Sequence, residues 1–159
     1  MSVKIGDTFP SGVFVSKDSD GIKHIYIEEY FESSTVVLFA LPGAFTPTCS
    51  AKHLPGYIKY YQDIKNKGVD IIACMAVNDP HVMRAWGIAN EVEGKIDMLS
   101  DSDCSVSQSL GLDMNFGRIM GHRSRRFAMI IEDNVIKKSF VEEVGAFEVS
   151  TAENILKNL

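Results

Sequence analysis

The sequence predicts an α/β fold in which helices cover both faces of a central mixed β-sheet. A continuous apolar run at residues 35–41 is typical of a strand that is buried on both faces, and residues 69–77 are expected to form a second buried strand. Helical apolar spacing follows each run, so strands and helices are expected to alternate along most of the chain. Near the end, Asp133-Asn134 separates two β-rich runs, Phe127–Ile131 and Val135–Phe140, and favours a hairpin turn between them.

The first half of the sequence predicts two short strands, a buried strand and a helix. The short strands are expected at Val13–Val15 and Ile25–Ile27, and the buried strand at 35–41 ends abruptly at Pro42-Gly43. A helix is expected next, because apolar residues recur every three or four positions until Gly68 provides a stop signal. Its apolar face consists of Leu54, Tyr57, Ile58, Tyr61 and Ile64.

The 69–77 strand leads into a helix over Pro80–Asn90, whose apolar stripe is expected to hold Val82, Trp86 and Ala89.

The remaining elements are shorter. We expect a strand at Ile96–Leu99, a helix at Ser105–Leu110 and then a loop punctuated by Gly111, Gly117 and Gly121. Ser150 is expected to cap a last helix over 151–159, with Glu153 in the capping-box position.

Length and composition favour one domain, residues 1–159, and exclude several functions. The chain has 159 residues, 45% of them hydrophobic, and a net charge of -5, which argues against nucleic acid or an anionic membrane as a partner. No apolar run reaches the roughly 18 residues that span a bilayer. The start lacks the layout of a secretion signal and the three cysteines form no disulfide framework, so a cytoplasmic location is expected. The tail Lys157-Asn158-Leu159 only loosely matches a peroxisomal signal.

Cys49 is the leading candidate for a reactive side chain. It lies in the segment PGAFTPTCS, residues 42–50, where a buried strand gives way to a helix. A helix N-terminus presents unpaired N–H groups and a partial positive charge, which lower the pKa of a cysteine and favour the nucleophilic thiolate. The alternative is that Cys49 is a small buried hydrophobe, as isolated cysteines often are.

Three blocks of residues resemble the type II, or peroxiredoxin-5, class of peroxiredoxins. They are PGAFTPTCS followed by His53-Leu54-Pro55-Gly56, VNDPHVMRAWG at residues 77–87, and RSRRFAM at residues 123–129. The resemblance spans nearly the whole chain and is nearest to plant-type, glutaredoxin-dependent members. It implies a thioredoxin-like fold, reduction of hydrogen peroxide and alkyl hydroperoxides, and a homodimer.

The family's catalytic motif falls on Pro42, Thr46 and Cys49, and its catalytic arginine on Arg126. The resemblance implies that Cys49 attacks the O–O bond, that the hydroxyl of Thr46 hydrogen-bonds peroxide and thiolate, and that Arg126 stabilises the thiolate and polarises the peroxide. Pro42 would shield the site. The expectation is therefore that Thr46 and Arg126 point toward Cys49 in the fold.

The residues around this motif allow less specific interpretations. Arg123 and Arg125 are expected on a solvated face. His53 follows Cys49 by four positions, so a helix would place both on one face, as in a Cys-His nucleophile pair or part of a metal site. Two ligands are too few for a metal, and no cofactor is expected. Leu112, Ile119 and Met120 are candidates for an apolar pocket wall that accepts alkyl groups.

Recycling of the oxidised cysteine needs a thiol, and the chain offers no evident one. Many members of the class carry a resolving cysteine shortly before the last helix, where residues 145–150 here read GAFEVS. Cys74 lies in an apolar run and is expected to be inert core, and Cys104 lies between Asp101 and Asp103, whose charges disfavour a thiolate.

A one-cysteine cycle with glutathione or glutaredoxin is therefore expected, with thioredoxin as the second candidate reductant. A peroxide sensor, which would signal to a partner instead of turning over, would share the first step, the oxidation of Cys49 by peroxide. A disulfide-exchange module is disfavoured, because Thr46 occupies the position of a second redox cysteine.

Overall fold

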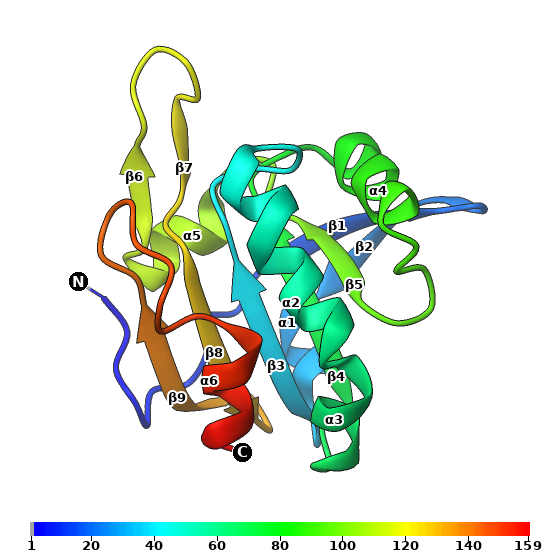
Figure 1. The fold of residues 1–159 in the computed structure, drawn as a ribbon, viewed down its shortest axis with the longest axis vertical. Helices are drawn as coiled ribbons and strands as arrows, with labels where there is room; N and C mark the ends of the chain where they lie inside the picture. The colour runs from blue at the N-terminus through cyan, green and yellow to red at the C-terminus, as the bar shows by residue number, and fades with distance from the viewer. Residues whose placement is uncertain (1) are drawn as a thin grey trace.

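Seven strands form one mixed sheet in the computed structural model of the chain, which describes residues 2–159 apart from the side chain of Cys49. The strand order is β2-β1-β5-β4-β3-β8-β9 (Figure 1). The bounds are β1 Val13–Asp18, β2 Gly21–Tyr26, β3 Thr35–Ala40, β4 Ile71–Ala76, β5 Asp97–Ser100, β8 Phe127–Glu132 and β9 Val135–Val141. β3, β4 and β5 are parallel to one another, and the other pairs are antiparallel.

Helices cover both faces of this sheet. One face carries α2 Leu54–Lys59, α3 Tyr61–Asn66, α4 Pro80–Ala89 and α6 Ala152–Lys157, and the other carries α1 Ile27–Phe31 and α5 Ser105–Leu110. A π-helical turn, η1 Cys49–His53, leads directly into α2. None of the helices in the described part of the chain is long and apolar enough to cross a membrane.

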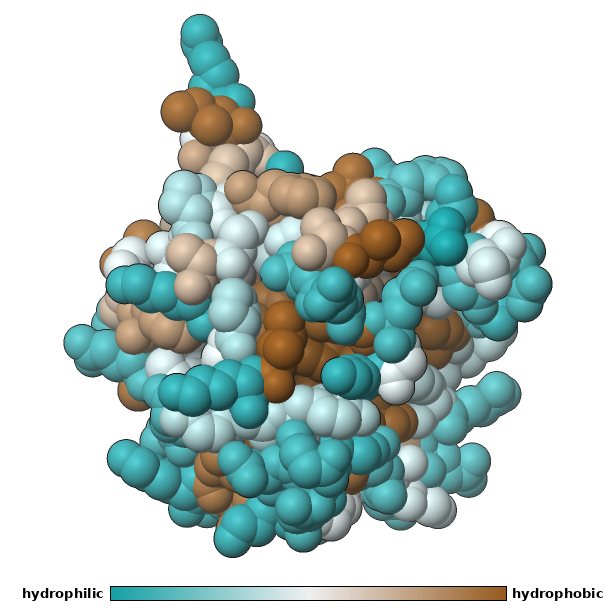
Figure 2. Space-filling view, turned by 45° about the vertical axis from the view of Figure 1, so that its right-hand side comes forward, coloured by the Kyte–Doolittle hydropathy of each residue, from teal (hydrophilic) through white to brown (hydrophobic). Residues whose placement is uncertain are grey.

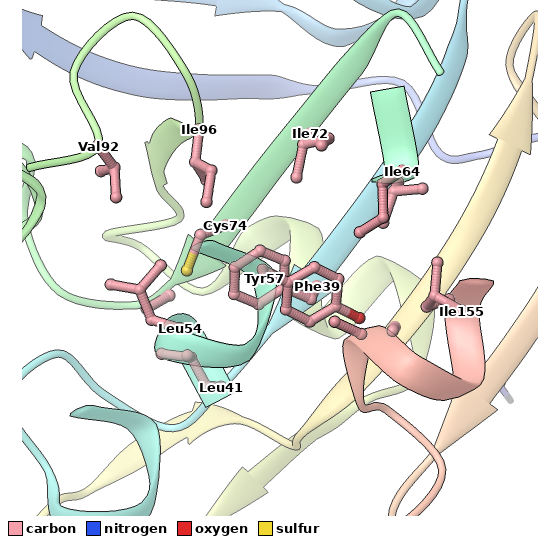
Figure 3. Packing of buried hydrophobic residues seen from close by; sticks show 14 of the residues in the cluster. Phe39, Leu41, Leu54, Tyr57, Ile64, Ile72, Cys74, Val92, Ile96 and Ile155 are labelled. Carbon is pink, nitrogen blue, oxygen red and sulfur yellow. The ribbon is translucent and has the colours of Figure 1, made fainter. Parts of the chain in front are cut away.

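The alternation of side chains along β3 divides the interior into two cores. Val37 and Phe39 face α2, whereas Val36 and Leu38 face α1 and α5, and all four are fully buried. The aromatic ring of Phe39 stacks on that of Tyr57, with 3.9 Å between centroids, in the core on the α2 side (Figure 3). A strand that is apolar on every residue is thus explained by burial on both faces.

A second, two-stranded sheet projects from the body. It consists of β6 Asp113–Asn115 and β7 His122–Ser124, and Figures 1 and 2 show this hairpin standing clear at the top of the molecule. The glycine-spaced segment after residue 110 was expected to be a loop, so the hairpin corrects that prediction. Gly117 and Gly121 adopt positive φ and form its turn.

The predicted α/β fold class with a mixed sheet and helices on both faces is confirmed, and most elements lie within a few residues of their predicted positions. Asp133 and Asn134 both adopt the positive φ of a tight hairpin turn between β8 and β9. Several details are wrong. Ile27 begins α1 instead of ending a strand, and the helix expected from Leu54 to Ile64 is divided into α2 and α3. Ala89 is exposed, since α4 buries Met83, Trp86 and Gly87, and Thr151 rather than Ser150 caps α6, accepting the N–H of Asn154 at 3.1 Å.

The sheet register explains how distant segments meet at one edge. β3 and β8 are antiparallel neighbours, with Ala40 opposite Phe127. The loop that leaves the carboxyl end of β3, residues 41–48, therefore begins next to Arg126, which immediately precedes β8. This pairing brings the backbone of the loop that carries Thr46 close to Arg126.

Candidate active site

The loop after β3 is held by a side chain from another segment and by a hydrogen bond within the loop itself. Its Ala44 N–H donates to the Oδ1 of Asn78 at 2.8 Å. The hydroxyl of Thr46 donates to the Gly43 carbonyl at 2.7 Å, and Phe45 between them adopts a positive φ of 63°. A non-glycine residue in the left-handed region is strained and persists only where neighbouring contacts impose it. The loop is therefore a fixed scaffold for the hydroxyl of Thr46.

Cys49 opens the π-helical turn η1. π-Helical turns within α-helices occur frequently at functional sites. The next residue, Ser50, is tied down by Trp86, whose indole N–H donates to its Oγ at 3.1 Å. The side chain of Cys49 lies outside the described residues, so the approach of Thr46 and Arg126 to its sulfur stays a prediction.

Arg126 is oriented by a buried histidine. Its Nη1 lies 2.8 Å from Nδ1 of His53. Because a guanidinium can only donate, Nδ1 must be the acceptor and the ring proton must reside on Nε2. That nitrogen donates to the Ser150 carbonyl at 3.1 Å. Both ring nitrogens are thus engaged, and His53 has no free lone pair with which to act as a base.

The protonation state of His53 supports this assignment. Burial, together with the positive charge of Arg126, lowers the pKa of His53 to about 3, so the ring is neutral near pH 7. Its side chain is fully buried between Phe39 and Phe147, with centroid distances of 5.1 Å to each ring. Arg126 also lies over the ring of Phe147, 5.8 Å from its centroid. A neutral, immobile acceptor fixes the guanidinium without neutralising its charge.

A buried carboxylate holds the segment that supplies Phe147 and Ser150. Glu142 is 3% exposed, and its Oε2 accepts hydrogen bonds from the Glu148 N–H, the Ser150 N–H and the Ser150 hydroxyl at 2.7–2.8 Å. The Ser150 carbonyl in turn accepts from Tyr57 at 2.8 Å as well as from His53. We call Glu142 and its three donors the Glu142 clasp.

A pocket of about 270 Å³ opens beside Thr46 and Arg126. Its lining comes from four segments, namely Pro42 with residues 46–48, Phe116 and Met120 of the hairpin, Arg125 and Arg126, and residues 142–146. Of the three residues expected to form an apolar wall, Met120 lies there. Leu112 is 2% exposed and packs in the core on the α5 side, and Ile119 is 95% exposed, so the expectation is corrected for these two.

The flanking arginines are not on a solvated face. Arg123 donates from Nη1 to the Pro42 carbonyl at 2.9 Å and from Nε to the Met120 carbonyl at 3.0 Å. Arg125 donates from Nη2 to the Glu142 carbonyl at 2.8 Å. Both side chains are partly buried and bonded to backbone carbonyls, so the prediction that they are solvated is wrong.

The two other cysteines are buried. Cys74 is fully buried on β4 and lies beside Leu54 and Tyr57 (Figure 3), and Cys104 is 6% exposed. Burial raises the pKa of Cys104, and the charges of Asp101 and Asp113 raise it further. Within the described residues, no cluster of three His, Cys, Asp or Glu side chains could hold a metal ion.

The fold and this site define a thioredoxin-like thiol enzyme, and the comparisons identify its family. Residues 4–156 match the model of the Redoxin family, so the chain belongs to that family. Peroxiredoxin-2B of Arabidopsis thaliana is 39% identical over 159 residues, which cover 99% of this chain and 98% of that protein. Peroxiredoxin-2E-2, chloroplastic, of Oryza sativa subsp. japonica is 42% identical over 164 residues, covering 99% and 73%.

Solved structures agree with this family assignment. The reduced Prx3 of Vibrio vulnificus in complex with hydrogen peroxide superimposes with a TM-score of 0.95 at 46% identity, and the match covers 98% of each chain. A 1-Cys peroxiredoxin of Plasmodium falciparum gives 0.91 at 31% identity, covering 99% of this chain and 100% of the other. The chain is thus a type II peroxiredoxin, and its activity is that of a thiol peroxidase.

Sequence reasoning missed two residues of the site. His53 was considered as a partner of Cys49, whereas the structure pairs it with Arg126. Glu142 carried no signal, since one glutamate among several near the end of a strand is indistinguishable from a solvated one. The only available hint for His53 was its position on the same helical face as the apolar residues Tyr57 and Ile64.

Proposed function

We propose that the chain reduces hydrogen peroxide and alkyl hydroperoxides through Cys49, and that glutathione, directly or through a glutaredoxin, recycles it. The contact that carries this proposal is the 2.8 Å hydrogen bond between Arg126 and the neutral His53. It holds a cationic donor beside the pocket and next to the turn that begins with Cys49.

The first step is a two-electron oxidation of the sulfur. The Cys49 thiolate attacks the oxygen of the hydroperoxide that carries hydrogen, so an S–O bond forms as the O–O bond breaks. Sulfur becomes sulfenic acid, and the departing hydroxide or alkoxide takes a proton to become water or alcohol. Arg126 donates to the oxygen on which negative charge develops. The hydroxyl of Thr46 donates its hydrogen bond to the Gly43 carbonyl, so its oxygen can accept a hydrogen bond from the peroxide O–H.

The pocket supports alkyl hydroperoxides as substrates. Phe116, Met120, Val144 and Ala146 present apolar groups in it, while Arg126 and Thr46 supply the polar ones. An alkyl group would lie against the apolar wall while the O–O bond meets the polar end.

The recycling thiol is proposed to come from outside the chain. Cys74 and Cys104 are buried, and residues 143–150 contain no cysteine. A relative of 31% identity is itself described as a 1-Cys peroxiredoxin. Glutathione would attack the sulfenic sulfur to form a mixed disulfide and water, and a second thiol would then release Cys49 and form the glutathione disulfide.

Three single substitutions test this cycle, namely Cys49→Ser, Cys74→Ser and Cys104→Ser. We expect Cys49→Ser to abolish peroxide consumption, and the other two variants to turn over with glutathione plus glutaredoxin at the unsubstituted rate. Loss of glutathione-dependent turnover in Cys74→Ser, with the first oxidation intact, would contradict the one-cysteine cycle. Faster turnover with thioredoxin would reassign the reductant, and a single oxidation without recycling would indicate a sensor.

The proposal also includes a single domain, a homodimer and a cytoplasmic location. Phe45, Ile119 and Val144 are exposed by 58%, 95% and 68% and lie in the loops around the pocket, so they are the apolar surface that a second copy would cover. Light scattering gives the mass in solution, one cooperative unfolding transition tests the single domain, and fractionation tests the compartment.

A further inference from the structure

Arg123 joins two walls of the pocket that are far apart in the sequence. Its Nη1 donates to the Pro42 carbonyl, 81 residues earlier, at 2.9 Å. Its Nε donates to the Met120 carbonyl at 3.0 Å. A guanidinium presents its donors in a rigid planar fork, so the two bonds fix the turn after β3 relative to the β6–β7 hairpin.

The Pro42 carbonyl follows the last residue of β3, which is Ala40, and it accepts the bond from Arg123 where the loop begins. The next carbonyl, that of Gly43, accepts the hydroxyl of Thr46 at 2.7 Å. The guanidinium of Arg123 is therefore one residue away from the group that orients this hydroxyl.

Gly43 leaves the space that this arrangement needs. A Cβ at residue 43 would lie 2.7 Å from Nη1 of Arg123, 3.3 Å from Cγ2 of Thr46 and 3.4 Å from Cε of Met120. Real Cβ atoms essentially never approach a nitrogen so closely. The space above Gly43 is thus filled by the guanidinium, and the absence of a side chain at residue 43 is what lets Arg123 reach Pro42.

We propose that Arg123 is a positioning residue for peroxide reduction, which locks the Pro42–Thr46 turn to the hairpin wall that holds Met120. This role rests on the proposed function, in which Thr46 and the pocket bind the hydroperoxide. Arg123 acts through the Pro42 and Met120 carbonyls and need not contact the peroxide.

Removing the lock should slow the oxidation of Cys49. A displacement of about 1 Å in a reacting geometry costs on the order of 100-fold in rate. We expect Arg123→Ala to lower the second-order rate constant of Cys49 oxidation roughly 10- to 100-fold. The loss should be larger for tert-butyl hydroperoxide than for hydrogen peroxide, because Met120 meets the alkyl group. Arg123→Lys keeps the charge but not the fork, so it should restore only a small part of the rate.

The decisive experiment is a double-mutant cycle with Gly43→Ala, read by stopped-flow oxidation of Cys49. Gly43→Ala alone should slow the reaction, because its Cβ displaces the guanidinium. In Arg123→Ala the same substitution should cost clearly less than it does alone, because the guanidinium is gone and only the 3.3 Å contact of the new Cβ with Cγ2 of Thr46 remains as a close approach. Arg118→Ala, an exposed residue of the same hairpin, is the control and should react at the unsubstituted rate. Thermal unfolding of each variant checks that it is folded, and Arg123→Lys replaces Arg123→Ala in the cycle if the latter is not.

Each result has a distinct meaning. Additive losses from Gly43→Ala and Arg123→Ala, or full activity in Arg123→Lys, would overturn the positioning role while leaving the peroxidase intact. Failure of the unsubstituted protein to form sulfenic acid with either peroxide would instead remove the proposed function, and the positioning role with it.

Discussion

At the scale of single residues, thiolate formation alone supplies little of the rate. A free cysteine with a pKa near 8.5 is a few per cent ionised at neutral pH, so complete ionisation raises the reactive fraction about 30-fold, or roughly 2 kcal/mol. Lowering the thiol pKa also reduces its intrinsic nucleophilicity. The larger contribution is expected from donors that stabilise charge as the O–O bond breaks, and Arg126 is the donor that we propose for this role.

Substitutions of Arg126 separate these two contributions. Arg126→Lys keeps a positive charge and should keep most of its effect on the pKa of Cys49, but it loses the planar donor set that His53 orients. We expect it to slow peroxide reduction at least about 10-fold. The pH dependence of Cys49 alkylation gives the thiol pKa, and stopped-flow kinetics gives the rate. A rate loss no larger than the pKa change explains would contradict this role.

His53 should leave a signature in the pH dependence of stability. Its folded-state pKa, about 3, lies below the unfolded value of about 6.5. Between those values the unfolded state binds a proton that the folded state does not, so the free energy of unfolding falls as the pH falls. From pH 7 to pH 5 this group alone should remove about 2 kcal/mol.

The measurement is urea unfolding at pH 7 and pH 5. The unsubstituted protein should lose about 2 kcal/mol more stability over this interval than His53→Gln, which cannot titrate. His24→Gln, at an exposed position, should behave like the unsubstituted protein. Equal losses in all three proteins would show that His53 does not stay neutral in the folded state.

At the scale of secondary-structure elements, the segment between β9 and α6 is ordered by one carboxylate. The Glu142 clasp collects three donors on a single oxygen. It thereby places the Ser150 carbonyl against His53 and the ring of Phe147 against Arg126. We therefore expect the ordering of residues 143–150 to affect peroxide reduction.

Glu142→Gln should loosen this segment. A neutral amide is a weaker acceptor and places an NH₂ group in the same buried space, so about 1–3 kcal/mol of stability should be lost. We expect faster proteolysis within residues 143–149 and slower Cys49 oxidation. Glu148→Gln is the matched control, because its side chain is exposed while its N–H remains available to the clasp. Similar effects in both variants would point to loss of negative charge rather than of the clasp.

The clasp also shows where sequence reasoning about elements stops. β3 was predicted to within one residue, because a run buried on both faces is apolar at every position. Ser150 and Thr151 both fit an N-cap, and the choice between them depends on Glu142, which takes the Ser150 hydroxyl from eight residues away. The bond from Arg123 to Pro42 crosses 81 residues. No local sequence pattern encodes such long-range contacts. They can be predicted only once the register of the sheet is known.

At the scale of the whole molecule, the sheet separates a core that contacts His53 from a second core on the α5 side. On the α2 side, Phe39 packs against Tyr57 and His53, so this core supports the residue that orients Arg126. On the opposite side, Phe31 packs against Phe9 and Phe14, at centroid distances of 5.2 and 6.4 Å. Phe39 and Phe31 are both fully buried, so the same truncation can be made on either face of the sheet.

Phe39→Leu and Phe31→Leu should therefore have similar effects on stability and different effects on activity. Each removes part of a buried ring, and each should cost about 1–2 kcal/mol in the free energy of unfolding. Phe39→Leu also removes a ring that confines His53, so the guanidinium of Arg126 loses part of its orientation and peroxide reduction should slow several-fold. Phe31→Leu should keep the unsubstituted rate, because its ring packs against Phe9 and Phe14 in the core on the α5 side, away from His53. The two variants are compared by the rate constant of Cys49 oxidation per folded molecule. It is measured well below the unfolding temperature of both variants. Equal rate losses would mean that the sheet transmits packing defects to the site from either face.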